Sequence, residues 1–250
     1  MPDGSKIAIV NPNTTTAMTE TIARAARAAA QPATEIVAIT SVSGPVSIEG
    51  YVDEALSLPG LLEAIARADR EGATGHVIAC FDDTGLDAAR QMARAPVIGI
   101  GEAGYHAASL IAGRFAVVTT TALSVAALEH NVVRYGFERR CTSVRSADVP
   151  VLELERAPEA AVEAIAAQIR IALEDERAEA IVLGCAGMAE MREALAARFD
   201  CPIVDGVGAS VGLVEMLNAS GLSTSRRGGY GPANPKPITG LLAQFGPHGK

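Results

Sequence analysis

Three segments in the first half of the chain recur in the same order in the second half. The members of each pair lie about 105 residues apart, far more than the ~20 to 50 residues of repeats that stack into solenoids. A repeat of this period predicts two duplicated domains of similar design. The pairs are Lys6-Ile-Ala-Ile-Val-Asn-Pro-Asn13 with Arg114-Phe-Ala-Val-Val-Thr-Thr-Thr121, His76-Val-Ile-Ala-Cys80 with Ala180-Ile-Val-Leu-Gly-Cys185, and Ala95-Pro-Val-Ile-Gly-Ile100 with Cys201-Pro-Ile-Val-Asp-Gly206.

Short runs rich in β-branched residues alternate along the chain with amphipathic helical patterns. The runs show no polar alternation, which is typical of parallel strands covered on both faces. Strands that alternate with helices predict an α/β fold built from right-handed βαβ units. The expected strands cover residues 6–10, 35–40, 76–80, 96–100, 114–118, 142–146, 180–184 and 202–204. The expected helices cover residues 15–30, 53–71, 84–94, 103–112, 123–135, 158–177, 189–199 and 209–220.

The order of these elements predicts where the chain passes between the domains. The last helix follows the final strand of the second half, where the first half has the helix that begins at Ala103. We therefore expect one domain from residues 1–100 plus 206–225 and another from residues 101–205. Residues 226–250 are rich in Gly and Pro, which excludes a helix at their start, and we expect this tail to lie on the body or on a neighbouring subunit.

Composition narrows the function classes. The 250 residues are 49% hydrophobic, but no run approaches the ~20 apolar residues of a membrane span. The start of the chain does not resemble a signal peptide, so we expect a soluble, cytoplasmic protein with no membrane partner. The net charge is −8 and no basic block occurs, which argues against a nucleic-acid partner. The four cysteines lack the paired short spacings of disulfide scaffolds and zinc sites.

Two of the cysteines occupy matching places in the repeat. Cys80 and Cys185 each follow an expected strand, and ligands of open parallel sheets bind beyond the carboxyl ends of the strands. Exposed backbone N–H groups and a helix dipole there are expected to lower the pKa of a thiol. A single free cysteine is as readily a small buried hydrophobe, but the matching positions favour function. Cys141 and Cys201 have no such symmetry and are expected to be structural.

Other motifs offer weaker alternatives. Gly99-Ile-Gly-Glu-Ala-Gly104 matches a dinucleotide-binding fingerprint, but the following strand ends in threonines instead of the acidic residue that holds the ribose. We read these glycines as a tight turn at the crossover. The histidines lack metal-ligand spacing. Asp82-Asp83 and Asp205 could serve a metal or act as a base, and helix capping is the stronger interpretation.

Two thiols that face each other suit one class of reaction. One thiolate can remove a proton from a bound carbon atom while the other thiol returns a proton on the opposite face, and no cofactor is needed. Backbone N–H groups after Cys80 and Cys185 could hold the developing enolate oxygen. Thr119, Thr120 and Asn13 would add side-chain polarity. Cys-His hydrolysis is less natural because no histidine accompanies either cysteine in the sequence.

Several segments closely resemble the hydantoin racemase branch, which includes allantoin racemases, of the aspartate/glutamate racemase superfamily. The match covers about residues 5 to 230. The segments are Asn11-Pro-Asn-Thr-Thr15, Pro45-Val-Ser-Ile-Glu-Gly50, His76-Val-Ile-Ala-Cys-Phe-Asp-Asp83, Gly113-Arg-Phe-Ala-Val-Val-Thr-Thr120, Ile181-Val-Leu-Gly-Cys-Ala-Gly-Met188 and Val204-Asp-Gly-Val207.

The resemblance implies two pseudo-symmetric flavodoxin-like domains with parallel sheets, an active site in the cleft between them, and assembly into homo-oligomers, as tetramers or hexamers. It implies a racemase of 5-monosubstituted hydantoins that needs no cofactor or metal, with Cys80 and Cys185 as the acid/base pair. The residues expected to line the ring pocket are Asn13, Ser47, Phe81, Asp82, Thr119, Thr120, Ala186 and Gly187. The chain departs from the family pattern at Gly104-Tyr105 and Thr121-Ala122, which we expect to lie around this pocket.

Charge supports a neutral cyclic ureide as the small-molecule substrate. The C5 proton of a hydantoin is flanked by a carbonyl, so its removal gives a singly charged enolate. An amino-acid carboxylate would form a dianion, and no Lys or Arg stands at a strand end to accept it. Allantoin racemisation, a maleate-type isomerisation or decarboxylation on the same scaffold, and a non-catalytic ligand-binding module remain the alternatives.

Overall fold

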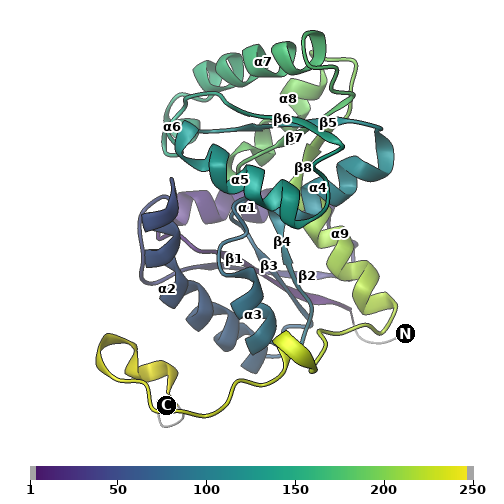
Figure 1. Ribbon diagram of the computed structural model, residues 1–250. Helices are drawn as coiled ribbons and strands as arrows, with labels where there is room; N and C mark the ends of the chain where they lie inside the picture. The colour runs from purple at the N-terminus through teal and green to yellow at the C-terminus, as the bar shows by residue number, and fades with distance from the viewer. Residues whose placement is uncertain (1–3, 247–250) are drawn as a thin grey trace.

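A computed structural model describes residues 4–246 and contains two separate parallel β-sheets (Figure 1). Each sheet has four strands, and all eight expected strands are confirmed to within two residues at each end. The first sheet contains β1 (Lys6–Asn11), β2 (Glu35–Thr40), β3 (Gly75–Ile78) and β4 (Val97–Gly99). The second contains β5 (Phe115–Thr119), β6 (Cys141–Ser146), β7 (Ala180–Leu183) and β8 (Ile203–Asp205).

The two sheets have the same topology. The strand order is β2-β1-β3-β4 in the first and β6-β5-β7-β8 in the second, and every pairing is parallel. The central strands β1, β3, β5 and β7 are almost entirely buried because helices cover both faces of each sheet. The predicted α/β fold with two pseudo-symmetric parallel sheets is therefore confirmed.

Nine α-helices occur in the described part of the chain. Their bounds are α1 (Thr16–Ala29), α2 (Tyr51–Arg70), α3 (Leu86–Met92), α4 (Ile100–Ile111), α5 (Ala122–Arg134), α6 (Glu153–Arg156), α7 (Pro158–Glu174), α8 (Arg192–Ala196) and α9 (Gly206–Ala219). The sequence did not predict the short α6. The helix expected over 189–199 is instead a 3-10 turn (Ala186–Met191) that leads into α8.

Helices α4 and α9 begin three residues earlier than expected, and both start on carboxylate caps. Asp205 accepts hydrogen bonds from the N–H groups of Val207 and Gly208 at the start of α9, so the capping interpretation of Asp205 is confirmed. The start of α4 is capped by Asp83, which lies on a different loop. A carboxylate there satisfies N–H groups that have no partner within the helix and favours the positive end of its dipole.

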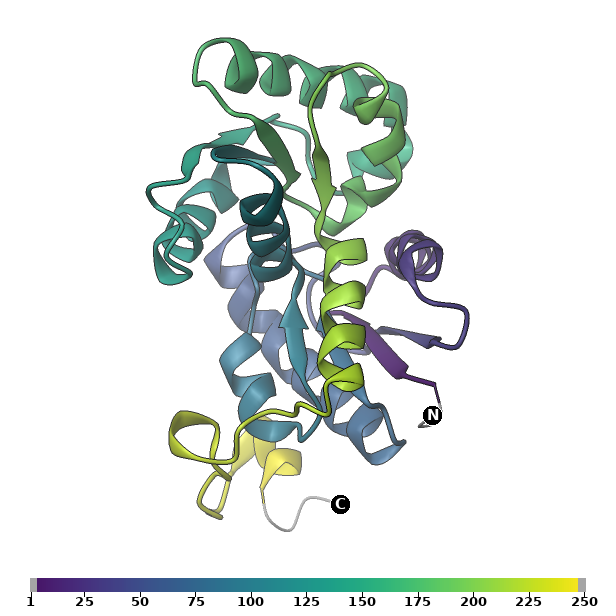
Figure 2. The same cartoon turned by 90° about the vertical axis from the view of Figure 1, so that its right-hand side faces the viewer.

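The same two helices are exchanged between the sheets. Helix α4 directly follows β4 of the first sheet but packs on β7 and β8 of the second. Helix α9 directly follows β8 of the second sheet but packs on β3, β4 and α1 of the first. The two helices also pack on each other, and Figure 2 shows α9 running from the second sheet along the first. We propose that the domains divide as the sequence predicts, at residues 100 and 206.

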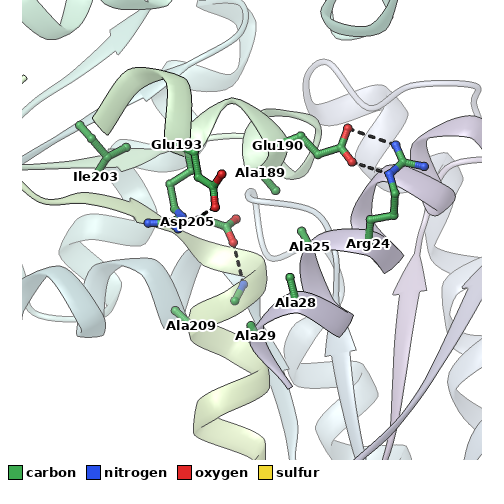
Figure 3. Close-up of a pocket in the computed structure, with 12 residues that line it drawn as sticks. Arg24, Ala25, Ala28, Ala29, Ala189, Glu190, Glu193, Ile203, Asp205 and Ala209 are labelled. Atoms are coloured by element: carbon green, nitrogen blue, oxygen red, sulfur yellow. Dashed lines mark hydrogen bonds and ion pairs between the residues drawn. The ribbon is translucent and has the colours of Figure 1, made fainter. Parts of the chain in front are cut away.

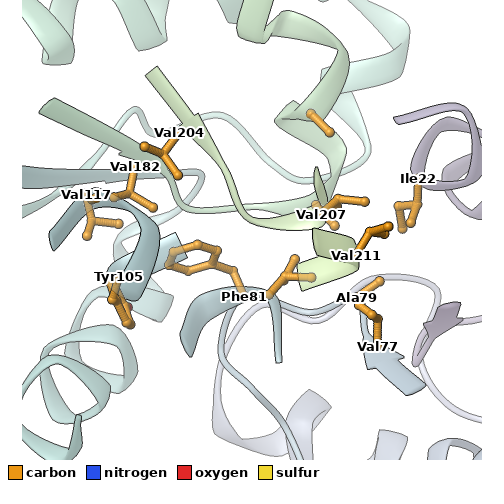
Figure 4. Close-up of a cluster of buried hydrophobic side chains, with 14 of the residues drawn as sticks. Ile22, Val77, Ala79, Phe81, Tyr105, Val117, Val182, Val204, Val207 and Val211 are labelled. Carbon is orange, nitrogen blue, oxygen red and sulfur yellow. The ribbon is translucent and has the colours of Figure 1, made fainter. Parts of the chain in front are cut away.

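An apolar cluster joins the two sheets. Phe81 and Tyr105 lie at its centre with their rings edge to face, 5.4 Å apart between centroids. Figure 4 shows Val117 and Val182 of the second sheet on one side of this pair and Ala79 of the first sheet on the other. Two further clusters fill the opposite faces of the sheets. Because the burial is continuous from sheet to sheet, the two halves share one apolar junction.

The C-terminal tail leaves the body after a short contact with α3. Arg226 donates to the backbone carbonyls of Gln91 and Ala93, and the Tyr230 hydroxyl donates to Asp87. Farther along, a 3-10 turn over Gly240–Phe245 leaves Leu241 95% exposed. Residues 247–250 of the predicted tail and 1–3 of the predicted first domain lie outside the described part. Among the described residues, no helix has the length and hydropathy that would allow it to cross a membrane.

Candidate active site

The carboxyl ends of both sheets meet at one cavity. Cys80 stands two residues beyond the end of β3, and Cys185 stands two residues beyond the end of β7. Both cysteines are free thiols that line this cavity. The lining comes from both halves of the repeat and consists of Pro12, Asn13, Met18, Ile48, Ala79, Cys80, Phe81, Asp82, Thr119, Thr120, Ser124, Val151, Gly184, Cys185 and Ala186.

Most of the residues expected in the ring pocket line this cavity. Those that do so, besides the two cysteines, are Asn13, Phe81, Asp82, Thr119, Thr120 and Ala186. Ser47 does not line the cavity, and its hydroxyl donates to Glu49 at 3.2 Å. Gly187 lines a separate outer groove, and its backbone N–H points to the sulfur of Cys185.

The cavity is small and partly open to the surface. Its volume is about 30 Å³, which admits roughly two water molecules and not a hydantoin ring with its two carbonyl oxygens. Two larger grooves of about 720 Å³ each lie elsewhere, on either side of the Arg24–Glu190 ion pair. Figure 3 shows the groove beside Asp205 and Ala209, whose lining includes neither cysteine. The two cysteines that follow the strands therefore line the small cavity and neither of the larger grooves.

Both cavity thiols have raised pKa values, which corrects the expectation that their surroundings lower them. Burial raises the pKa of Cys80 well above its usual range, and the charge of Asp82 raises it further. Burial also raises the pKa of Cys185 to about 12, although the N–H groups of Gly187 and Met188 favour its thiolate. The sequence placed the N–H groups correctly, but loss of water around the sulfur outweighs them.

Asp82 is the acidic side chain of the cavity. Burial raises its pKa to about 7, and the charge of Glu54 adds to this effect. Its backbone carbonyl accepts from the amide of Asn131, and Ser124 lies 3.5 Å from its carboxylate. Both partners lie on α5, so the loop after β3 is held by the second half of the molecule. Asp82 caps no helix, and the capping interpretation is wrong for this residue.

The neighbouring Asp83 is a structural bridge. It is 3% exposed, and its carboxylate accepts from the N–H groups of Gly101 (2.9 Å) and Glu102 (2.7 Å) and from the Tyr135 hydroxyl (2.7 Å). Burial raises the pKa of Asp83 to about 7 against these three donors. The capping interpretation is thus correct for Asp83, although the capped helix is α4 and not the helix that follows it.

The Asp83 carboxylate also explains the glycine-rich segment. A Cβ atom on Gly99 would lie 2.0 Å from Asp83 Oδ1, and one on Gly101 would lie 2.3 Å from the carbonyl oxygen of Phe81. The backbone φ of Gly99 is −86°, so these glycines allow close packing and do not form the tight turn expected from the sequence. In a dinucleotide site the first helical N–H groups would hold the pyrophosphate. Here Asp83 occupies them.

Polar groups of the first strand end have defined partners. Asn13 accepts from the Thr15 N–H at 2.9 Å and donates to the sulfur of Met18, a weak acceptor. The Thr119 hydroxyl donates to the Gly184 carbonyl at 2.9 Å and fixes the Cys185 strand end against β5. Asn13 consequently retains donor capacity towards the cavity, whereas Thr119 supports its wall.

The sequence missed several lining residues, chiefly Ile48, Ser124 and Val151. Ile48 belongs to a segment that carried the family resemblance, but Ser124 and Val151 had no motif. Tyr105 and Thr121, expected around the pocket, do not line it themselves but adjoin the lining residues Phe81 and Thr120. Tyr105 is fully buried behind Phe81. Within residues 4–246 no cluster of three or more His, Cys, Asp or Glu side chains could hold a metal ion.

Comparisons with known proteins agree with this geometry. The chain is 43% identical over 241 residues to a hydantoin racemase of Pseudomonas sp. (strain NS671), covering 96% of this chain and 97% of that one. It is 36% identical to a hydantoin racemase of Paenarthrobacter aurescens, covering 90% and 96%. The fold matches a solved allantoin racemase from Klebsiella pneumoniae with a TM-score of 0.94, 43% identity and 98% and 100% coverage. A family model described as Asp/Glu/hydantoin racemase matches residues 7–214, and the chain belongs to that family.

Proposed function

We propose that this protein racemises 5-monosubstituted hydantoins by proton transfer between Cys80, Cys185 and the C5 atom of the substrate. One cysteine, as thiolate, takes the C5 proton and becomes a thiol. The other, as thiol, gives its proton to the opposite face of C5 and becomes a thiolate. The enolate between these steps carries one negative charge, and no cofactor or metal takes part.

The observation that carries this proposal is the placement of the two thiols. They follow equivalent strands of two sheets with the same topology and line one cavity. A reaction that inverts a carbon centre needs an acid and a base on opposite faces of that carbon. Equivalent positions in a pseudo-symmetric pair of sheets supply two such groups.

The lining of the cavity favours a neutral substrate. Among the described residues that line it, Asp82 is the only one with a charged side chain, and none is Lys or Arg. A substrate with a free carboxylate would therefore meet repulsion without a compensating cation. A cyclic ureide carries no charge and offers carbonyl groups to donors such as Asn13.

The relatives leave the 5-substituent open. The similar proteins include hydantoin racemases and allantoin racemases, so allantoin racemisation is the main alternative. A maleate-type isomerase or decarboxylase of the same scaffold is less favoured, because its carboxylate substrate would meet no Lys or Arg in the described lining. A non-catalytic binding module is less favoured because binding alone does not need a thiol from each half.

A substrate panel in deuterium oxide tests the proposal. Each enantiomer of allantoin and of alkyl- and aryl-substituted hydantoins is incubated with the enzyme and followed by polarimetry and by proton NMR at C5. We expect loss of optical rotation together with incorporation of deuterium at C5 for at least one substituent class. Spontaneous exchange is measured with a Cys80→Ser/Cys185→Ser double variant. Binding without exchange would indicate the non-catalytic module and exclude the racemase.

We also propose that the protein works as a cytoplasmic homo-oligomer, a tetramer or a hexamer. The reaction needs two free thiols, which a reducing compartment preserves. The tail supplies an unpartnered apolar turn, because Leu241 is 95% and Leu242 45% exposed. An apolar segment that leaves the body gains stability when it packs on another copy.

The tail gives an expected result for self-association. We expect the Leu241→Ser/Leu242→Ser variant to dissociate into smaller species, measured by light scattering after size exclusion at equal protein concentrations. Gln244→Ser in the same exposed turn is the matched control and should leave the mass unchanged. A monomeric native protein, or an unaltered mass for the leucine variant, would refute this role.

A further inference from the structure

A loop of the first half covers the catalytic cavity. It runs from Gly44 to Gly50, and Ile48 within it lines the cavity while only 8% exposed. Both terminal glycines adopt positive φ angles, 132° for Gly44 and 117° for Gly50, which other residues rarely adopt. The loop is thus bounded by two positions of special backbone geometry and carries one wall of the cavity between them.

The start of this loop is anchored within its own half. The Thr14 N–H donates to the Pro45 carbonyl at 3.0 Å, and the Thr15 hydroxyl donates to the Val46 carbonyl at 2.7 Å. Near the end of the loop, the Glu49 N–H donates to Asp53 of α2. These bonds fix the loop backbone to the first sheet and its helices.

The side chain of Glu49, in contrast, reaches the other half. Its Oε1 atom accepts the N–H of Val151 at 3.1 Å. Val151 is 4% exposed and lines the cavity, as Ile48 does. The Val151 segment is itself held to the end of β5 by a hydrogen bond from Val149 N–H to the Thr120 carbonyl. One carboxylate therefore joins the two halves where they close over the thiols.

The hydrogen bond between Glu49 and Val151 lies where the two halves of the molecule can separate. Chain crossovers and the exchanged helices α4 and α9 tie the halves together on one side of the molecule. Figure 1 shows α6 and the start of α2 on the side away from α4 and α9. A cavity of about 30 Å³ is too small for a hydantoin ring, so the halves must move apart to admit one, and the side without crossovers is where they can do so.

We propose that Glu49 is the latch of this site, a positioning residue that accepts the Val151 N–H when the halves close over the substrate and releases it when they open. This inference rests on the proposed racemase activity for its catalytic meaning. Its structural part, a carboxylate that holds the cavity shut, stands on the hydrogen bonds alone.

Glu49 also places a negative charge near the proposed acid/base pair. After burial and the charge of Asp82, the charge of Glu49 raises the pKa of Cys185. Cys185 in turn raises the pKa of Cys80. Closure therefore brings a negative charge towards Cys185, and replacing Glu49 by an uncharged acceptor should lower the pKa of that thiol.

Hydrogen exchange of the Val151 amide tests the latch without substrate. We expect Glu49→Ala to accelerate this exchange at least tenfold, because the N–H loses its acceptor. Glu49→Gln keeps an acceptor oxygen and should stay within about threefold of the native rate, as should Glu35→Gln, an exposed control on β2. Exchange of β7 amides is the internal reference. An unchanged Val151 rate in Glu49→Ala, or an equal acceleration throughout β7, would overturn the proposal.

Kinetics then separate the latch from the proposed activity. If the native enzyme does not exchange C5 hydrogen in any substrate, the racemase proposal fails. The hydrogen exchange of the Val151 amide would still test whether Glu49 holds the two halves together. With an active enzyme, we expect Glu49→Ala to raise KM about tenfold and Glu49→Gln to keep KM within about twofold. The pH profile of Glu49→Gln should move to lower pH, because less alkali is needed to form the Cys185 thiolate. If the pH profile of the Glu49→Gln enzyme coincided with that of the native enzyme, the proposed effect of the Glu49 charge on Cys185 would be overturned.

Discussion

Cys80→Ser and Cys185→Ser should each reduce racemisation by about 10²- to 10⁴-fold, the range that positioned acid/base groups contribute. A serine hydroxyl is a far weaker acid than a thiol and cannot exchange a proton with C5 at useful rates. Because each face of the carbon depends on one sulfur, loss of either thiol should block inversion in both directions. The measurement is the loss of optical rotation from each pure enantiomer, at equal concentrations of folded enzyme.

The matched control for both variants is Cys201→Ser. Cys201 precedes β8 and lies away from the cavity lining, so the same chemical change there should leave the rate within about twofold. Circular dichroism should show the same fold for all three variants. If either cavity variant racemised at the native rate, the two-thiol mechanism would be wrong.

Asp83→Ala should lower the free energy of unfolding by about 3 to 5 kcal/mol. The change leaves the N–H groups of Gly101 and Glu102 and the Tyr135 hydroxyl without their acceptor, and buried groups without partners cost ~1 to 3 kcal/mol each. It also places alanine at a φ of 53°, which alanine disfavours. Chemical denaturation measures the free energy of unfolding, and we expect the Tm to fall by roughly 10 °C.

Asp148→Ala is the control because Asp148 has the same φ of 53° but is exposed. Its loss should cost about 1 kcal/mol or less. Asp83→Asn retains one acceptor oxygen and tolerates positive φ. Its loss of stability should therefore lie between the losses of the two alanine variants. Equal losses for Asp83→Ala and Asp148→Ala would show that backbone strain, and not the bridge to α4, dominates.

The sheets were predictable because their signal is local. Each buried parallel strand is a short run of β-branched residues, and the repeat indicated that both halves carry the same succession of strands along the chain. The starts of α4 and α9 were not predictable from local pattern. The sequence predicted Gly101 in a tight turn and Gly208 just outside the helix expected over 209–220, whereas in the structure both lie in first helical turns capped by Asp83 and Asp205.

The site was predictable only in part, for a related reason. Cys80 and Cys185 follow strands, so sequence position indicated the cavity. The pKa direction depended on how much water the packed halves exclude from the sulfur atoms, which is a property of the closed structure. Val151 shows the same limit, because it reaches the cavity through the packing of an irregular segment that no periodicity marks.

The exchanged helices set an order for the appearance of structure during synthesis. The first sheet is complete when residue 99 has been made, yet the helix that covers β3 and β4 is the last one of the chain, Gly206–Ala219. An emerging chain normally folds its N-terminal domain first. Helix α1 covers the same face of the sheet over β1 and β2, but the part over β3 and β4 lacks its helix until the chain has been made to residue 219, so completion of the first domain coincides with that of the second. The cavity between the sheets is lined from both halves and is therefore completed late in synthesis.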